Sequence, residues 1–290
     1  MSNTAEAKGE AVAGLLISTL IWGVSFPVIK VAVADIDPLF FVTLRFLIAA
    51  LVVLIILAVL QRSVRKLVNN RILWILGITN AAGFVMEFFG LTLTTASNAA
   101  LLVNVNIVFV AIFSAVMLKD RIVNRVKIGI LIGLIGVFLT TTNGNILALN
   151  SGSTIGDLII FTGGIVWAFS NIYNKRAVTD LSLSPIEVTE SMTITTAVAL
   201  IPILPFSSLA FPVTTFSVSA LFYISIICTI FAFFLFYRAL KAITIVHAGI
   251  VMLFEIVVAV IASYLFLGEG ITTAGAFGGL LIGLSILLAS

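Results

Sequence analysis

Residues 38–60, PLFFVTLRFLIAALVVLIILAVL, form an apolar run with a single charged side chain, Arg45, beyond its first turn. A helix of about 20 apolar residues spans the hydrocarbon core of a bilayer, and this run lacks the polar alternation of a barrel strand. Across the whole chain 61% of residues are hydrophobic and 9% are charged, and the mean hydropathy is +1.30. Lipid must therefore be the solvent for most of the surface. The sequence predicts an all-α integral membrane protein.

Similar apolar runs recur along the chain. They predict ten transmembrane helices at residues 11–34, 38–60, 72–92, 97–118, 125–142, 155–176, 185–206, 216–238, 245–267 and 271–289. The first apolar run is too long for a signal peptide, so we expect it to be retained. The connections are too short for a soluble domain and contain no Gly-x-x-x-x-Gly-Lys loop. Nothing in the sequence indicates ATP-driven work.

The basic residues indicate the orientation. Thirteen of the fifteen Lys and Arg residues fall on one side of the predicted helices; the exceptions are Lys30 and Arg45. By the positive-inside rule that side is cytoplasmic. We expect a multi-pass protein of the cell (inner) membrane with both termini in the cytoplasm. The basic pI near 9.2 follows from this loop charge and does not indicate nucleic-acid binding.

Metal and cofactor sites are not expected. The chain has one cysteine, Cys228, and one histidine, His247. Structural zinc needs several Cys or His ligands, and an internal disulfide needs two cysteines. The expected partners are the lipid bilayer and a small-molecule substrate.

The two halves of the chain repeat each other. Trp22-Gly-Val-Ser25 corresponds to Trp167-Ala-Phe-Ser170, 145 residues later, and Ile122 corresponds to Ile271, 149 residues later. Pro38 and Pro185 are 147 residues apart. With five spans in each half, the second copy must cross the membrane in the opposite sense. The sequence thus predicts two inverted-topology five-helix repeats, residues 11–142 and 155–289, around a central cavity, as in secondary transporters.

Several motifs resemble the EamA-type drug/metabolite transporter superfamily. They are the Trp-x-x-Ser pattern in each half, the segments 89–102 (FGLTLTTASNAALL) and 237–243 (YRALKAI), and the half-endings 118–122 (LKDRI) and 267–271 (LGEGI). The resemblance covers nearly the whole chain. It implies ten helices, a central cavity and export of small metabolites, and it is nearest to bacterial amino-acid exporters, including the aromatic amino-acid type. The family often has Glu-Pro midway along the fourth and ninth spans, where this chain has Asn106-Ile107 and Glu255-Ile256.

Ionisable residues within spans are candidates for a functional or structural role, because inserting a charged side chain near the bilayer centre costs at least ~2.5–3.5 kcal/mol of free energy. Glu87 and Glu255 are the deepest acids, and Arg45 is the only basic residue well inside a span. Asn80 and Phe84 share a helical face with Glu87. The acids are candidates to bind substrate or carry a proton, and Arg45 to attract a substrate carboxylate. An internal ion pair between them is the structural alternative.

Further candidates for the cavity wall come from the repeated motifs. Trp22, Trp167, Phe84 and Tyr237 could stack flat or apolar substrates, while Ser25, Asn80 and Ser170 bind polar ends; aromatic packing between helices is the alternative. His247 and its repeat counterpart Asn98 are also candidates, although a lone histidine near an interface is usually solvated or at a helix end.

Proline and glycine suggest mechanical roles. Pro27 should interrupt the first span and provide a hinge. Glycine stripes mark the fifth span (Gly129, Gly133, Gly136) and the tenth (Gly275, Gly279, Gly283). Such stripes allow close helix approach. We expect these two helices to pack on each other, with homodimerisation as the rival use, so the stripes leave a monomer and a homodimer both open.

The leading functional prediction is secondary transport, in the direction of export, of small amphipathic metabolites such as amino acids. Drugs or other metabolites are the alternative cargo. A solute channel would need a continuous polar pore, for which the polar residues are too sparse. An intramembrane enzyme would need catalytic motifs that the chain lacks.

Overall fold

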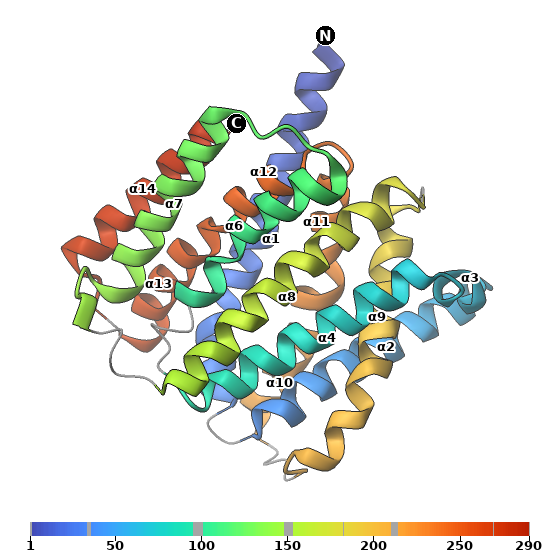
Figure 1. Ribbon diagram of the computed structural model, residues 1–290. Coiled ribbons are helices and arrows are strands. Elements are labelled where there is room, and N and C mark those ends of the chain that lie inside the picture. The colour runs from blue at the N-terminus through green and yellow to red at the C-terminus, as the bar shows by residue number, and fades with distance from the viewer. Residues whose placement is uncertain are drawn as a thin grey trace.

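The computed structural model describes residues 2–33, 36–94, 101–147, 153–181, 183–209, 214–268 and 270–289 (Figure 1). These residues form helices and short connections, and no strand occurs among them. Helices suit a bilayer, because they pair the backbone N–H and C=O groups within each segment. The predicted fold class is confirmed.

Ten apolar helical segments occupy the predicted positions. Nine in the described part of the chain are long and apolar enough to cross a membrane: Ala7–Ala32, Pro38–Val59, Arg71–Gly90, Leu101–Leu118, Asn124–Thr142, Thr154–Thr179, Pro185–Phe206, Thr215–Leu240 and Ile245–Leu267. The tenth, Thr273–Leu288, is shorter. The helices that carry them are α1 (Ser2–Ala32), α2 (Pro38–Val59), α4 (Arg71–Leu91), α6 (Asn106–Phe113), α7 (Asn124–Thr142), α8 (Thr154–Thr179), α9 (Pro185–Leu200), α10 (Thr215–Phe222), α11 (Ala232–Leu240), α12 (Ile245–Met252), α13 (Phe254–Leu267) and α14 (Thr273–Ala289).

Some local features were not predicted. A short helix, α3 (Val64–Val68), follows the second span and buries Leu67 against Val53 and Ile194. Two segments have wider π-type turns, η1 (Ser114–Leu118) and η4 (Tyr223–Phe231), and η3 (Ile201–Phe206) has 3₁₀ turns. Wide turns of this kind often occur at functional sites.

The first helices of the two halves run in opposite directions. Glu10, near the start of α1, pairs with Arg238 at the end of α11. Lys175, near the end of α8, donates to the carbonyl oxygen of Ile243, just after α11. The start of α1 therefore lies on the same side as the end of α8, as Figure 1 also shows. This is the geometry of an inverted repeat.

The packing of the helices follows the same pseudo-symmetry. α4 packs along α8, and its counterpart α11 packs along α1. Two further pairs, α2 with α9 and α7 with α14, join equivalent helices of the two halves. Figure 1 shows α7 and α14 side by side at one edge of the molecule.

The contact between α7 and α14 depends on glycine. A Cβ on Gly136 would lie 2.7 Å from the carbonyl oxygen of Gly278, and a Cβ on Gly278 would lie 2.6 Å from that of Gly136. Gly129 and Gly133 also face α14, at Ser285. The predicted packing of the fifth and tenth spans is confirmed.

The predicted stripe on the tenth span was right at Gly275 and wrong at its other two members. Gly275 faces Thr140 near the end of α7, whereas Gly279 lies opposite Val257 of α13, and a Cβ on Gly283 would meet no neighbour within 4 Å among the described residues. Gly278, which the prediction omitted, makes the close contact instead. Gly279 and Gly283 line a groove between α13 and α14.

The fourth and ninth spans both break in the middle, although neither has a proline there. The breaks lie at Val105 (φ −60°, ψ −16°) and at Leu253 (φ −57°, ψ −21°). After each break a tighter i→i−3 hydrogen bond forms, from Val108 to Val105 and from Ile256 to Leu253. Both spans are thus interrupted close to Asn106 and Glu255 without a proline.

Candidate functional site

Five residues from four helices meet in the interior and are called the central cluster: Arg45, Phe84, Glu87, Trp167 and Glu255. Arg45 comes from α2, Phe84 and Glu87 from α4, Trp167 from α8 and Glu255 from the start of α13. The break at Leu253 places Glu255 in the first turn of α13. Both halves of the chain therefore contribute to the cluster.

Arg45 is the fixed cation of the central cluster and is 5% exposed. Its Nε donates to the Thr229 hydroxyl at 2.7 Å. Its guanidinium carbon lies 4.9 Å from the centre of the Phe84 ring and 5.2 Å from that of Phe46. Desolvated cation–π contacts of this kind contribute about 2 kcal/mol. They hold the guanidinium in place and leave its terminal nitrogens for another partner.

Trp167 and Phe84 form an aromatic wall beside Glu87. Their rings meet edge to face with centroids 4.8 Å apart. The Trp167 ring lies over Gly83, where a Cβ would be 2.9 Å from the ring. Glu87 lies one turn further along α4 and interacts with the Trp167 indole. Glycine at 83 therefore permits the position that brings the indole to the acid.

The two acids interact electrostatically with Arg45 and with each other. Among the described residues the ion pairs lie at helix ends, and none joins Arg45 directly to Glu87 or Glu255. Both acids are half-buried. The cluster thus holds one positive group and two acidic groups that are near one another but not in direct contact.

Trp22 takes the pseudo-symmetric place of Trp167. It meets Phe233 edge to face at 5.1 Å, and Phe233 is the counterpart of Phe84 at the 149-residue offset. Trp22 is 8% exposed, and its Nε1 donates to the Cys228 carbonyl oxygen at 2.8 Å. This indole is already bonded within the protein, at the wide turns of η4.

The contact of Arg45 with Thr229 also has a counterpart. At the repeat offsets, Arg45 corresponds to Met192 and Thr229 to Asn80. In the structure Asn80 Nδ2 contacts Met192 Sδ at 3.5 Å and donates to Thr196 at 3.1 Å. The pseudo-two-fold axis therefore relates the positions of the two contacts. Their charges differ, because the contact of Arg45 with Thr229 includes a cation and the contact of Met192 with Asn80 does not.

Several predicted residues lie in helix interfaces. Ser25 donates to its own helix at the Trp22 carbonyl, and the Tyr237 hydroxyl donates to Asn174 Oδ1 at 2.8 Å. Ser170 is fully buried, and its hydroxyl has no hydrogen-bond partner among the residues that the structure describes. Asn80 lies between α4 and α9.

His247, Asn98 and Pro27 lie elsewhere. His247 is in the first turn of α12, and its Nδ1 bonds the Thr244 hydroxyl that caps this helix. Asn98 lies outside the described residues. The prediction that Pro27 interrupts the first span was wrong, because α1 continues through it; its role as a hinge stays a prediction.

The sequence analysis missed some contacts of the predicted residues. Thr229 and Phe46 contact Arg45 of the central cluster, and the Cys228 carbonyl oxygen accepts from Trp22 outside it. The repeat offsets pointed to Thr229, since it is the counterpart of Asn80. Phe46 had no such signal among 23 phenylalanines.

One end of the molecule carries ion pairs between the halves. Arg62, after α2, pairs with Glu190 of α9 at 2.8 Å, and Lys66 of α3 pairs with Glu187 at 2.7 Å. At the other end of the same two helices, the counterparts of Glu187 and Glu190 are Phe40 and Thr43. Ion pairs therefore link the segment that follows α2 to α9 at one end of these two helices.

The two tryptophans should respond differently to truncation. Trp22→Ala removes a buried ring and its hydrogen bond to η4, so we expect a loss of stability of about 3–5 kcal/mol. Trp167→Ala removes a half-buried ring beside Glu87, so we expect impaired transport with a smaller change in melting temperature. Thermal unfolding and transport of both variants measure this. Equal destabilisation by both would assign Trp167 to packing alone.

The sequence of this chain is similar to those of known transporters. A sequence profile of the EamA-like transporter family matches residues 9–142 and again residues 154–290, which confirms the resemblance. An uncharacterized transporter of Archaeoglobus fulgidus is 29% identical over 232 residues, 78% of each chain. A probable amino-acid metabolite efflux pump of Salmonella typhimurium is 29% identical over 199 residues, 66% of this chain and 60% of that protein.

A protein of known crystal structure has the same fold. It superposes with a TM-score of 0.80 at 18% identity, over 97% of both chains. Taken together with the two profile matches and the transporters among the relatives, the helices and their arrangement identify a multi-pass membrane transporter, not an enzyme. The chain belongs to the EamA-like transporter family.

Proposed function

We infer that this protein exports small amphipathic metabolites, with amino acids as the leading class, by alternating access through a central site. The observation that carries the inference is the central cluster, which combines a fixed guanidinium, two acids and an aromatic wall. An amino acid presents a carboxylate, an ammonium group and a side chain. Each has a complementary partner in the cluster.

The arrangement of the partners supports this substrate class. The terminal nitrogens of Arg45 can form two parallel hydrogen bonds to a carboxylate. Glu87 or Glu255 can accept from an ammonium group. Phe84 and Trp167 offer ring faces and edges to an apolar or aromatic side chain. The relative from Salmonella typhimurium, named as a probable amino-acid metabolite efflux pump, supports the same class.

Transport in proteoliposomes tests the proposal. Purified protein is reconstituted and loaded with one of a panel of radiolabelled amino acids. A carrier should give saturable flux and counterflow, in which unlabelled substrate on one side drives labelled substrate from the other. Flux that rises linearly with concentration and shows no counterflow indicates a channel. Counterflow with drugs or other metabolites but with no amino acid overturns the substrate class and keeps the transporter.

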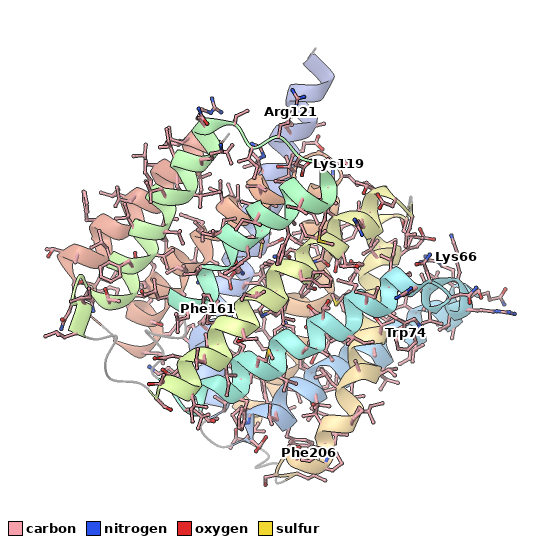
Figure 2. All side chains as sticks on the ribbon, in the orientation of Figure 1. Lys66, Trp74, Lys119, Arg121, Phe161 and Phe206 are labelled. Carbon is pink, nitrogen blue, oxygen red and sulfur yellow. The ribbon has the colours of Figure 1, made fainter. Side chains whose placement is uncertain are left out.

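The orientation is proposed from the basic residues. Figure 2 shows Lys119 and Arg121 at the end of the molecule where Figure 1, in the same orientation, marks the N-terminus, and Phe206 at the opposite end. The positive-inside rule makes the basic end cytoplasmic. We propose the inner membrane of the cell as the location, with both termini in the cytoplasm.

Reporter fusions measure this topology. Fusions after residue 66 and at the C-terminus should report the cytoplasm, and a fusion near residue 148 the opposite side. The reason is that five spans separate residue 148 from each terminus. A cytoplasmic signal at residue 148 would contradict the inverted arrangement.

A further inference from the structure

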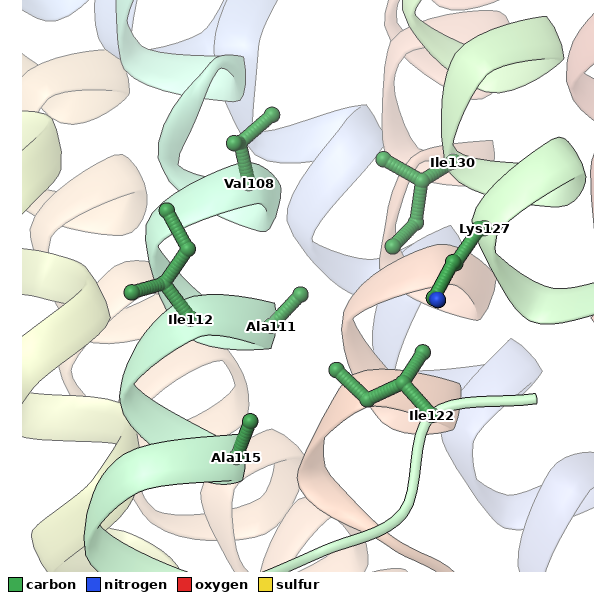
Figure 3. Close-up of a pocket in the computed structure, with 7 residues that line it drawn as sticks. All are labelled: Val108, Ala111, Ile112, Ala115, Ile122, Lys127 and Ile130. Carbon is green, nitrogen blue, oxygen red and sulfur yellow. The ribbon is translucent and has the colours of Figure 1, made fainter. Parts of the chain in front are cut away.

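Two grooves open on the outer surface of the bundle. The first, about 340 Å³, lies between α6–η1 and α7. Figure 3 shows its walls, with Val108 and Ile112 on one side, Lys127 and Ile130 on the other and Ile122 on the segment that connects them. The second, about 620 Å³, lies between α13 and α14.

The two grooves are equivalent under the repeat. At the 149-residue offset, Val108, Ile112 and Ile122 of the first correspond to Val257, Ile261 and Ile271 of the second, and all six line their grooves. Because the halves are inverted, the two grooves face opposite leaflets of the membrane. Three equivalent apolar side chains therefore line a groove in each half, although the second groove is the larger.

One equivalent pair differs in charge. Lys127 lines the first groove, and its counterpart Ala276 lines the second. The Lys127 side chain is exposed, and its ammonium group makes no ion pair or hydrogen bond to any residue that the structure describes. A lysine whose stem follows an apolar wall can place its ammonium group at the level of the lipid headgroups.

Further basic residues lie close to Lys127 in the chain. Lys119 and Arg121 are exposed on the connection that leads to α7, and Arg125 is exposed in the first turn of α7. This is the side that the basic residues predict to be cytoplasmic. Anionic lipids give the cytoplasmic leaflet a negative surface potential, and basic pockets between helices on that side bind anionic headgroups.

We propose that the first groove is a binding site for one anionic phospholipid of the cytoplasmic leaflet. An acyl chain lies against Val108, Ile112 and Ile130, and Lys127 binds the phosphate of the headgroup. The second groove takes an acyl chain of the other leaflet without selecting for charge, because Ala276 stands where Lys127 would be.

Native mass spectrometry of the full-length protein tests the site. The protein in detergent is mixed with equal amounts of phosphatidylglycerol and phosphatidylcholine that have the same acyl chains. Wild type should retain phosphatidylglycerol in preference. Lys127→Ala should lower the ratio of bound phosphatidylglycerol to phosphatidylcholine about fivefold, the effect of one lysine near the membrane surface.

Two matched variants sharpen the result. Ala276→Lys puts the missing charge into the second groove and should add a second selectively bound phosphatidylglycerol. Lys241→Ala removes a basic residue outside both grooves and should keep the wild-type ratio. Melting temperatures close to wild type show that the variants are folded.

Three outcomes overturn the proposal. One is a Lys127→Ala ratio equal to that of wild type. Another is an equal fall in Lys241→Ala, which would mean that net charge and not the groove selects the lipid. The third is a dimer without bound lipid, which would make the groove an interface between two copies of the chain.

Discussion

Replacing Arg45 by methionine should reduce amino-acid counterflow about 10–100-fold. The change removes the only cation of the central cluster and makes this position like its repeat counterpart, Met192. Hydrogen bonds to a charged group contribute about 1.5–3 kcal/mol, and the substrate carboxylate would lose those that Arg45 provides. The two acids would also lose their counter-charge. Counterflow of a transported amino acid in proteoliposomes measures the effect.

Two variants serve as controls for Arg45. Arg45→Lys keeps the charge and loses the planar fork, so it should retain part of the activity. Thr229→Ala removes the acceptor that orients Nε and should cost less than Arg45→Met. Wild-type counterflow in Arg45→Met would show that the substrate does not contact the guanidinium.

If Glu87 carries a proton, Glu87→Gln should abolish the stimulation of net transport by a pH gradient and preserve exchange of substrate. Glu87 and Glu255 together face one guanidinium, so the cluster can become neutral by holding one proton. Glutamine keeps the shape of the side chain and loses its titration. Net efflux with and without an imposed pH gradient, compared with exchange at equal pH, measures the two properties separately.

The alternative role of Glu87 gives a different pattern. If this acid binds the substrate's ammonium group, exchange itself weakens, and it weakens most for substrates that carry the group. Asp157→Asn is a suitable control, because Asp157 lies in the first turn of α8 and bonds Thr94. Unchanged net transport and unchanged exchange in Glu87→Gln would leave the acid a structural partner of its neighbours.

The spans could be predicted because their apolar runs are set by the thickness of the bilayer. The predicted spans 185–206 and 245–267 have the bounds of Pro185–Phe206 and Ile245–Leu267, and the others differ by a few residues. The break at Leu253 could not be predicted inside that run, because no proline or glycine marks it. Neither could α3, whose five residues are too short for a periodic pattern.

The central cluster was predicted in part. Charge deep in a span identified Arg45, Glu87 and Glu255, since such residues are rare in a membrane. The sequence did not separate Trp22 from Trp167, because both have the same motif. They differ in the structure because the wide turns of η4 offer a carbonyl oxygen to Trp22, while the Gly83 surface brings Trp167 to Glu87. Each tryptophan therefore makes its distinguishing contact with the other half of the chain, where its own repeat motif gives no information.

In the proposed alternating-access cycle, the ion pairs of Arg62 and Lys66 with α9 should give the two half-reactions different sensitivities to ionic strength. Opening at that end separates opposite charges, whereas opening at the other end of α2 and α9 parts residues such as Phe40 and Thr43. Dissolved salt screens exposed charges and so lowers the barrier to the first step without affecting the second. A rise in salt on the basic side would therefore speed the step that admits cargo from that side. The same rise on the opposite side would leave the release step unchanged.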